Sequence, residues 1–233
     1  MVVVNLEEMQ ARSGFVRETA ATGFVFVVEG LAGIARVASQ KFRGRQVELM
    51  WSKREEAVRW SDALAVEPRV TQTSLLELLS RHLPKLADER RLVGPDWTDA
   101  PCEPEMSAEE LDRLLRRRLI DQLIETATKT RQVWILKSAD MPATIVTRHP
   151  AGGEALPVFA DRASAEQLID GEWSHCAAHR VPIGDFVQKT IVWCVETRRR
   201  IAPAFVPGPG LVEMPAWDMK ALLAGGGHVR RVA

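Results

Sequence analysis

The sequence predicts an α+β fold with two similar repeats, each a small, mainly antiparallel sheet packed with helices, joined by a long shared helix. Two observations lead to this prediction. A shift of 108 residues, which brings Glu105 onto Glu213, aligns three separate segments of the chain. Both copies then show the same order of strand and helix spacings. The 233 residues suffice for two domains of ordinary size. We place the first repeat at residues 1–118 and the second at 119–233, with a Gly-rich tail from 225.

The repeat is clearest in residues 105–115, which fall on 213–223 with five identities in eleven positions. Unrelated sequences of average composition match at about one position in sixteen. The same shift places 25–28 on 133–136, two apolar segments with an aromatic residue at the same position. Between the matched segments the alignment shift changes, because residues 70–72 fit best at a shift of 111. We therefore expect short insertions in the loops.

Each repeat begins with an amphipathic helix followed by a pair of strands. Short runs of apolar, mostly β-branched or aromatic, residues predict these strands near 24–29 and 33–39 in the first copy, and near 132–137 and 143–147 in the second. A third strand and a helix follow in both copies. The order of elements is therefore expected to be the same in the two repeats.

Ser52 and Asp161 are expected to cap the helix that follows the third strand, because short polar side chains accept hydrogen bonds from the free N–H groups of a helix start. Two further helices and a hairpin complete each repeat. Strands near 201–206 and 211–214 are expected to form a hairpin around a Pro-Gly-Pro-Gly turn. In copy two, the helix after the one that Asp161 caps carries one regular buried stripe. The stripe is made of Ile183, Phe186, Val187, Thr190, Ile191, Cys194 and Val195.

A long helix from about 107 to 130 is expected to join the repeats. Ser107, with Glu110 three residues later, forms a capping box at its start. Apolar residues then keep helical spacing from Leu111 to Ala127 without a Gly or Pro to end the helix. At 1.5 Å per residue its length is roughly 36 Å.

The second copy resembles a known family. The residues that carry the resemblance are 132–136 (QVWIL), 156–159 (LPVF), Ala165, 171–173 (GEW), 183–186 (IGDF) and the late Pro-Gly hairpin. In order and spacing they are similar to the bacterial domain of unknown function family 2750 over nearly all of residues 119–225. The first copy resembles a diverged member that lacks the GEW element. The resemblance implies the fold of that family and no known reaction.

Composition and charge exclude several classes of protein. The chain has 31 basic and 31 acidic residues, so no strong field favours nucleic acid or a membrane surface. The most apolar stretch, 19–28, is half as long as the roughly 20 residues of a membrane-spanning helix. The N-terminal residues lack the basic leader of a secretory signal. Three widely spaced cysteines indicate reduced thiols, and we expect a cytoplasmic protein.

The sequence contains no established catalytic motif. Gly-rich phosphate loops, the zinc-protease motif and the serine-hydrolase elbow are all missing, so we predict no catalytic residues and no cofactor. His175 and His179 would share one face of a helical turn and are weak metal candidates. We favour a polar loop there, because two ligands do not close a metal site. Cys194 lies on the buried stripe and Cys102 lies among acids, so neither is expected to act as a nucleophile.

A partner-binding surface is the remaining prediction for a site. It consists of an acidic segment and of tryptophans that do not fit a buried stripe: Asp96, Trp97, Asp99, Glu103, Trp173 and Trp193. Exposed Trp often anchors a protein partner, and acidic patches attract basic ones. The alternatives are that the acids are a solvated face and that the other copy buries the tryptophans.

The leading functional hypothesis is a non-enzymatic cytosolic protein-binding module. It would be a bacterial immunity-type or effector-associated protein that binds a basic partner protein. One alternative is a small-molecule-binding or hydrolytic protein with a pocket between the repeats, using His175, His179 or an acidic pair. Another is a structural module that associates with itself.

Overall fold

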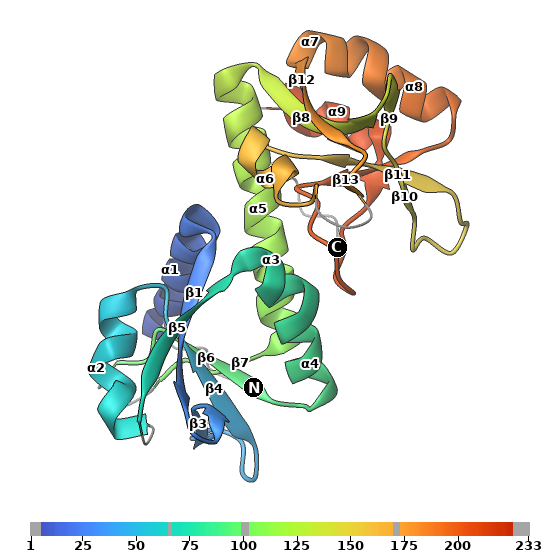
Figure 1. Ribbon diagram of the computed structural model, residues 1–233. Helices are drawn as coiled ribbons and strands as arrows, with labels where there is room; N and C mark the ends of the chain where they lie inside the picture. The colour runs from blue at the N-terminus through green and yellow to red at the C-terminus, as the bar shows by residue number, and fades with distance from the viewer. Residues whose placement is uncertain (1–5, 65–66, 99–102, 170–172, 226–233) are drawn as a thin grey trace. The chain divides into compact units, whose positions relative to one another are not determined.

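The computed structural model describes residues 6–64, 67–98, 103–169 and 173–225. The chain divides into two compact units. Unit 1 runs up to Arg118 and also includes Val206–Gly210, whereas unit 2 comprises Leu119–Phe205 and the chain from Leu211 onward. Figure 1 shows both units as small sheets covered by helices.

Unit 1 contains two small sheets. Their strand orders are β2-β1-β5, which is antiparallel, and β3-β4-β6-β7, in which β4 and β6 are parallel. A bridge between Phe26 and Trp51 connects the two sheets. The elements are α1 (Leu6–Thr22), β1 (Phe24–Gly30), β2 (Gly33–Ile34), β3 (Arg36–Ala38), β4 (Gln46–Met50), α2 (Arg54–Leu64), β5 (Arg69–Ser74), α3 (Leu75–Glu77), the π-helical turn η1 (Leu78–His82), α4 (Leu83–Asp88), β6 (Leu92–Pro95) and β7 (Met106–Ser107).

Unit 2 repeats this arrangement. Its sheets are β12-β8-β9 and β10-β11-β13-β14, and a bridge between Trp134 and Phe159 connects them. Helix α5 (Ala108–Thr130) contributes its first part to unit 1 and its second part to unit 2. The other elements are β8 (Gln132–Ser138), β9 (Met141–Pro142), β10 (Ile145–Val146), β11 (Glu154–Val158), α6 (Arg162–Glu166), β12 (Ala177–Pro182), α7 (Ile183–Asp185), η3 (Phe186–Thr190), α8 (Ile191–Glu196), β13 (Arg200–Pro203), β14 (Met214–Pro215) and α9 (Ala216–Ala224).

The predicted tandem fold and its long helix are confirmed, but the expected loop insertions are wrong. Strand β5 starts at Arg69 and its counterpart β12 starts at Ala177, a shift of 108 that also relates β4 to β11 and β6 to β13. The better apparent match at a shift of 111 reflects similar apolar residues rather than equivalent positions. The two copies can therefore be compared residue by residue.

A π-helical turn interrupts the helix after the third long strand in both copies. It spans Leu78–His82 in unit 1 and Phe186–Thr190 in unit 2. The extra residue in a π turn lengthens one step of the buried stripe to five residues. The prediction of a regular α-helical stripe is therefore wrong. The buried residues are Leu75, Leu78, Leu79, Leu83 and Leu86 in one copy and Ile183, Phe186, Ile191 and Cys194 in the other.

The π turn of unit 1 leaves one backbone carbonyl to be satisfied by a side chain. The N–H group of Leu83 donates to the carbonyl of Leu78, five residues earlier. The next such donor would be residue 84, but this is a proline and has no N–H. The guanidinium of Arg116, which is 4% exposed, donates to the carbonyl of Leu79 at 3.3 Å instead. It also pairs with Asp112 at 3.0 Å.

The turn Val206–Gly210 packs within unit 1 against the same arginine. Arg116 donates to the carbonyl of Val206 at 2.6 Å and to that of Pro207 at 3.4 Å. The backbone passes so close that a Cβ atom on Gly208 would lie 2.7 Å from the Leu79 carbonyl oxygen. The predicted hairpin around this turn is shorter than expected, because β13 ends at Pro203 and β14 starts at Met214.

Helix starts follow the predicted caps in two of three places. The Asp161 carboxylate accepts from the Ser164 N–H at 2.8 Å, and the Ser107 hydroxyl accepts from the Glu110 N–H at 3.1 Å. Ser52 behaves differently, because its hydroxyl donates to Asp96 at 2.8 Å. None of the described helices is long and apolar enough to cross a membrane.

Candidate functional site

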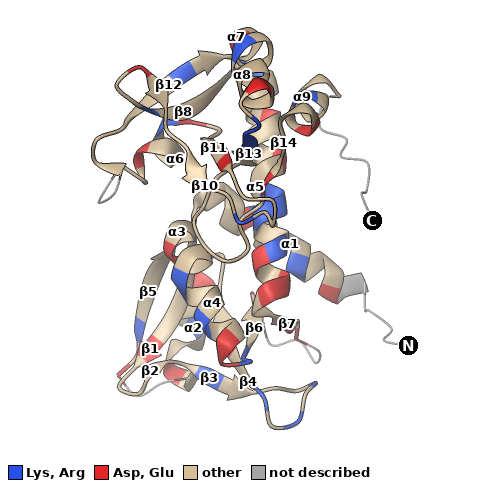
Figure 2. Ribbon diagram, turned by 90° about the vertical axis from the view of Figure 1, so that its right-hand side faces the viewer, with Lys and Arg blue, Asp and Glu red and all other residues tan. Residues whose placement is uncertain are grey.

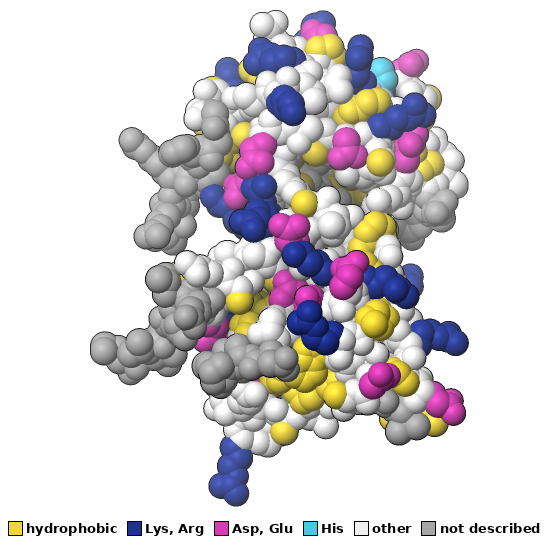
Figure 3. Space-filling model, turned by 90° about the vertical axis from the view of Figure 1, so that its left-hand side faces the viewer, with side chains coloured by type: hydrophobic (Ala, Val, Ile, Leu, Met, Phe, Trp, Pro, Cys, Tyr) yellow, Lys and Arg dark blue, Asp and Glu magenta, His cyan; other side chains and the backbone are white. Residues whose placement is uncertain are grey.

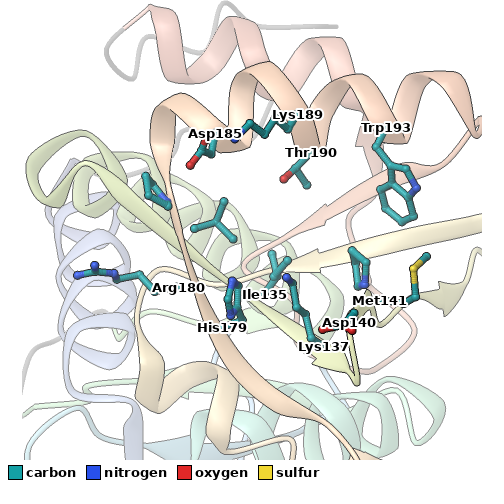
Figure 4. Close-up of a pocket in the computed structure, with 13 residues that line it drawn as sticks. Ile135, Lys137, Asp140, Met141, His179, Arg180, Asp185, Lys189, Thr190 and Trp193 are labelled. Carbon is teal, nitrogen blue, oxygen red and sulfur yellow. Dashed lines mark ion pairs between the residues drawn. The ribbon is translucent and has the colours of Figure 1, made fainter.

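An open pocket of about 390 Å³ lies within unit 2, between the sheet β12-β8-β9 and the helical segment α7-η3-α8 (Figure 4). Its volume falls in the range of about 300–1,000 Å³ that is typical of ligand sites. Apolar and charged side chains both contribute to its wall. The lining residues are Ile135, Lys137, Asp140, Met141, Pro142, His179, Arg180, Val181, Pro182, Asp185, Lys189, Thr190 and Trp193.

Strand pairing positions the floor of the pocket. Ile135 and His179 are directly opposite each other on β8 and β12, so their side chains share one face of the sheet. Lys137 lies two residues further along β8 and therefore on the same face. Ile135 is 1% exposed and forms the apolar bottom. Met141 and Pro142 of β9 continue the wall, and the Met141 side chain is largely exposed.

The helical segment supplies the opposite wall. Asp185, Lys189 and Trp193 recur every four residues and lie along the side of the segment that faces the strands (Figure 4). The ammonium of Lys189 pairs with Asp185 at 2.8 Å. No described carboxylate pairs with Lys137, and no described basic group pairs with Asp140. The pocket thus combines an apolar bottom with a charged rim.

Trp193 is held in place from outside the pocket. The guanidinium carbon of Arg199 lies 4.6 Å from the centroid of the Trp193 ring. Glu154 holds Arg199 in turn, with 2.7 Å between Oε2 and Nε. Neither of these two charged residues is among the described residues that line the pocket. Trp193 therefore has a charged support behind it and contributes to the pocket wall.

The structure brings two of the predicted site residues together and leaves two others apart. Trp193 and His179 both line the pocket. Trp173 is half-buried and packs against Phe205, with 6.4 Å between ring centroids. The expectation that His175 and His179 share a helical turn is wrong, because β12 begins at Ala177 and puts His179 on an extended strand. Among the described residues, no three His, Cys, Asp or Glu side chains form a metal-binding group.

The acidic segment of unit 1 turns inward where the structure describes it. Glu103 is 2% exposed, and its carboxylate accepts from the Thr98 N–H at 2.9 Å. Asp96 accepts from the Ser52 N–H at 2.6 Å, and burial raises the pKa of its carboxyl although the Ser52 hydrogen bonds lower it. Asp99 lies outside the described residues. The expected acidic docking surface therefore has two of its three carboxylates engaged in backbone hydrogen bonds.

Trp97 lies in the core of unit 1 and offers no exposed ring. It is 4% exposed and packs among buried apolar residues such as Leu49 and Trp51. Its indole N–H donates to the carbonyl of Pro104 at 2.7 Å. Burial within its own repeat, rather than by the other copy, explains why this tryptophan fits no helical stripe.

Basic and acidic groups are mixed on the surface in both units. Lys and Arg alternate with Asp and Glu along the elements in Figure 2, and they lie side by side on the face shown in Figure 3. The two described cysteines, Cys176 and Cys194, are free and buried. Burial raises the pKa of the Cys194 thiol to about 12, although Arg199 lowers it, so this thiol stays protonated at neutral pH.

Unit 1 contains a buried ionic cluster that the sequence did not reveal. Glu48 is fully buried on β4 and contacts Nε2 of His82. Its other carboxylate oxygen lies 3.3 Å from Nε of Arg36. The equivalent residues of Glu48 and His82 in unit 2 are Leu156 and Thr190. The second copy has no charged group at either of these two positions.

Replacing His82 with Thr is expected to destabilise unit 1 by about 2 kcal/mol, because Glu48 then keeps a buried charge with one partner fewer. The double variant Glu48→Leu, His82→Thr copies the pair found in unit 2 and should regain most of this loss. Urea denaturation of the two single variants, the double variant and the unchanged chain measures the coupling. A His82→Thr variant as stable as the unchanged chain would show that the pair contributes nothing.

The pocket residues other than Trp193 and His179 were missed because no motif marks them. A comparison of the two copies at a shift of 108 is the signal that could have found them. Lys137 corresponds to Glu29, Met141 to Gly33 and Trp193 to Lys85. Positions that change in chemistry between two copies of one fold are candidates for a site that only one copy has.

Comparison with known proteins gives a family and two distant structural likenesses. The model of the family described as "Protein of unknown function (DUF2750)" matches residues 13–115 and again 120–223. Anabaena Tic22 (protein transport) is 9% identical, with a TM-score of 0.25, and the match covers 95% of this chain and 99% of that one. Tic22 from Plasmodium falciparum is 10% identical, with a TM-score of 0.24, and coverage of 91% and 98%. No curated protein matches the chain.

Proposed function

Because the chain belongs to the DUF2750 family through both of its repeats, and because its second copy has an open pocket whose lining differs in chemistry from the equivalent positions of the first, we propose that it is a non-enzymatic protein-binding module. The second repeat holds the recognition site, and the pocket of unit 2 accepts a short extended segment of a partner protein. Trp193 is the main anchor.

The observation that carries this proposal is the open pocket with a tryptophan in its wall. Trp, Tyr and Arg dominate the binding energy of protein interfaces when they lie in a pocket surrounded by polar groups. Here the apolar bottom at Ile135 is bordered by Lys137, Asp140, Asp185 and Lys189. An exposed methionine beside it, Met141, can adapt to different side chains.

Features of the site favour binding over catalysis. No established catalytic motif of the sequence supplies residues to the pocket. Cys194, which follows Trp193 in the chain, is buried, and its thiol stays protonated at neutral pH because burial raises its pKa to about 12. The predicted basic partner receives no support from Asp96 or Glu103, whose carboxylates bind backbone N–H groups. An immunity-type or effector-associated role and a cytoplasmic location stay predictions.

Exchanging Trp193 for Lys, the residue that the first repeat has at this position, is expected to abolish partner capture. The unchanged chain and the variant are each coupled to resin and exposed to extract of the source cells, and proteins bound in stoichiometric amounts are identified by mass spectrometry. A partner that is retained by the unchanged chain and lost with Trp193→Lys supports the proposal. Both chains should have the same far-UV circular dichroism.

The matched control is Trp217→Glu. Trp217 is 51% exposed on α9, does not line the pocket, and corresponds to Glu109 in the first repeat. This control should capture the partner as the unchanged chain does. Loss of the partner with Trp217→Glu but not with Trp193→Lys would move the binding surface to α9 and contradict the proposal.

A further inference from the structure

The surroundings of Trp193 restrict what the pocket can hold, provided that the pocket is the binding site proposed above. Arg199 occupies one side of the indole ring, at 4.6 Å from its centroid. Trp193 lines the pocket, whereas Arg199 is not among the described lining residues. The part of the indole ring that Arg199 does not cover is therefore the part that a ligand can contact. A ring held by an Arg–Glu pair loses little conformational freedom when a ligand binds, which favours affinity.

The Arg199 cation beside the ring also affects which charge a ligand group near Trp193 can have. A cation near an aromatic ring is attracted by the negative charge of its π face. Arg199, itself paired with Glu154, already takes this attraction on one side of the ring, so a second cation would gain less from Trp193 than from a ring with no cation beside it. A neutral aromatic side chain is favoured instead, since offset stacking of two rings contributes about 0.5–1.5 kcal/mol beyond burial.

The charged rim of the pocket supports the same conclusion. Lys189 is neutralised by Asp185 at 2.8 Å. Lys137 has no ion-pair partner among the described residues and lies on the floor side, two residues from Ile135. Asp140, on the turn between β8 and β9, is the remaining carboxylate of the pocket, and it is exposed. The interaction energy of a half-buried lysine with a ligand carboxylate is larger than that of an exposed aspartate with a ligand base, because solvent and salt screen the exposed charge more.

From these contacts we infer that the pocket selects an extended segment with an aromatic side chain stacked on Trp193 and a neighbouring carboxylate paired with Lys137. Basic segments are rejected. The first repeat cannot make this selection at the equivalent place, because it has Lys85 instead of Trp193 and Glu29 instead of Lys137. Its arginine at the position of Arg199 is Arg91, which pairs with Glu89 at 2.6 Å.

Three fluorescein-labelled peptides of nine residues test the inference with the full chain. Each has a central Trp, flanked on both sides by Asp, by Ser or by Lys, in an otherwise identical Gly-Ser background. Fluorescence anisotropy should show the Asp peptide binding at least tenfold more tightly than the Lys peptide, with the Ser peptide between them. Trp193→Lys should remove binding of the Asp peptide, and Trp217→Glu should leave it unchanged.

A charge-reversal variant distinguishes this inference from non-specific hydrophobic binding of the peptides. Lys137→Glu, which copies Glu29 of the first repeat, should reverse the order of the Asp and Lys peptides. Tighter binding of the Lys peptide to the unchanged chain, lost with Trp193→Lys, would overturn the inference and leave the proposed function standing. The same holds if no peptide binds although the Trp193-dependent partner is captured. Failure of both experiments would remove the proposed function as well.

Discussion

Replacing Arg116 with Met is expected to lower the free energy of unfolding of unit 1 by about 3 kcal/mol, the cost typical of removing one partner of a buried ion pair. The arginine side chain is 5% exposed and that of Asp112 is 13% exposed. Methionine keeps most of the buried apolar contact of the stem but leaves the Asp112 carboxylate without its partner. The carbonyls of Leu79 and Val206 lose their donor as well.

The measurement is urea denaturation followed by circular dichroism and Trp fluorescence. Arg113→Met is the matched control, because Arg113 lies on the same helix, is exposed and should change stability by less than about 0.5 kcal/mol. Equal stability of the two variants would show that the Arg116 contacts are not needed. A further variant, Pro84→Ala, supplies the missing N–H and should reduce the loss caused by Arg116→Met.

Gly94→Ala is expected to destabilise unit 1 by about 2–3 kcal/mol, within the range for overpacking a core. A Cβ atom at this position would lie 2.6 Å from Nε1 of Trp97 and 2.7 Å from Cδ2 of Leu49. Trp97 cannot simply move away, because its indole N–H donates to Pro104 and its carbonyl accepts from the Trp51 indole at 3.1 Å.

The second repeat shows how the clash is relieved. Its residues at the positions of Gly94 and Trp97 are Ala202 and Phe205. The second repeat thus combines the additional methyl group of alanine with a smaller aromatic ring. The double variant Gly94→Ala, Trp97→Phe should therefore be more stable than the sum of the two single losses by at least about 1 kcal/mol. Additive losses, measured by denaturation of all three variants, would contradict the packing argument.

The order of the elements could be predicted because it depends on local patterns. The apolar run Val25–Val28 and the capping groups Asp161 and Ser107 act within a few residues of the chain. The repeat then extended each local prediction to the other copy. The π turn could not be predicted in this way, since Leu79 and Leu83 in one copy, and Val187 and Ile191 in the other, keep the four-residue spacing of an ordinary helix.

The site depended on contacts between distant residues and was predicted only in part. Trp193 was named because it did not fit the buried stripe, but the same observation also named Trp97, which lies in the core of unit 1. Glu103 and Asp96 were misjudged, because a sequence shows how many carboxylates a segment has but not which backbone N–H groups they face. The pocket itself depends on strand pairing, which brings His179 opposite Ile135 across 44 positions of the chain.

Helix α5 is an element that the two repeats own in common. Its beginning occupies the place that α9 has in the second copy, and its remainder occupies the place of α1 in the first. A cut between Arg118 and Leu119 would thus divide one continuous helix, leaving the part that matches α9 with the first repeat and a shortened equivalent of α1 with the second. Loss or gain of one full period of the gene, by contrast, would preserve every helix, so the architecture can shorten or grow only in whole steps.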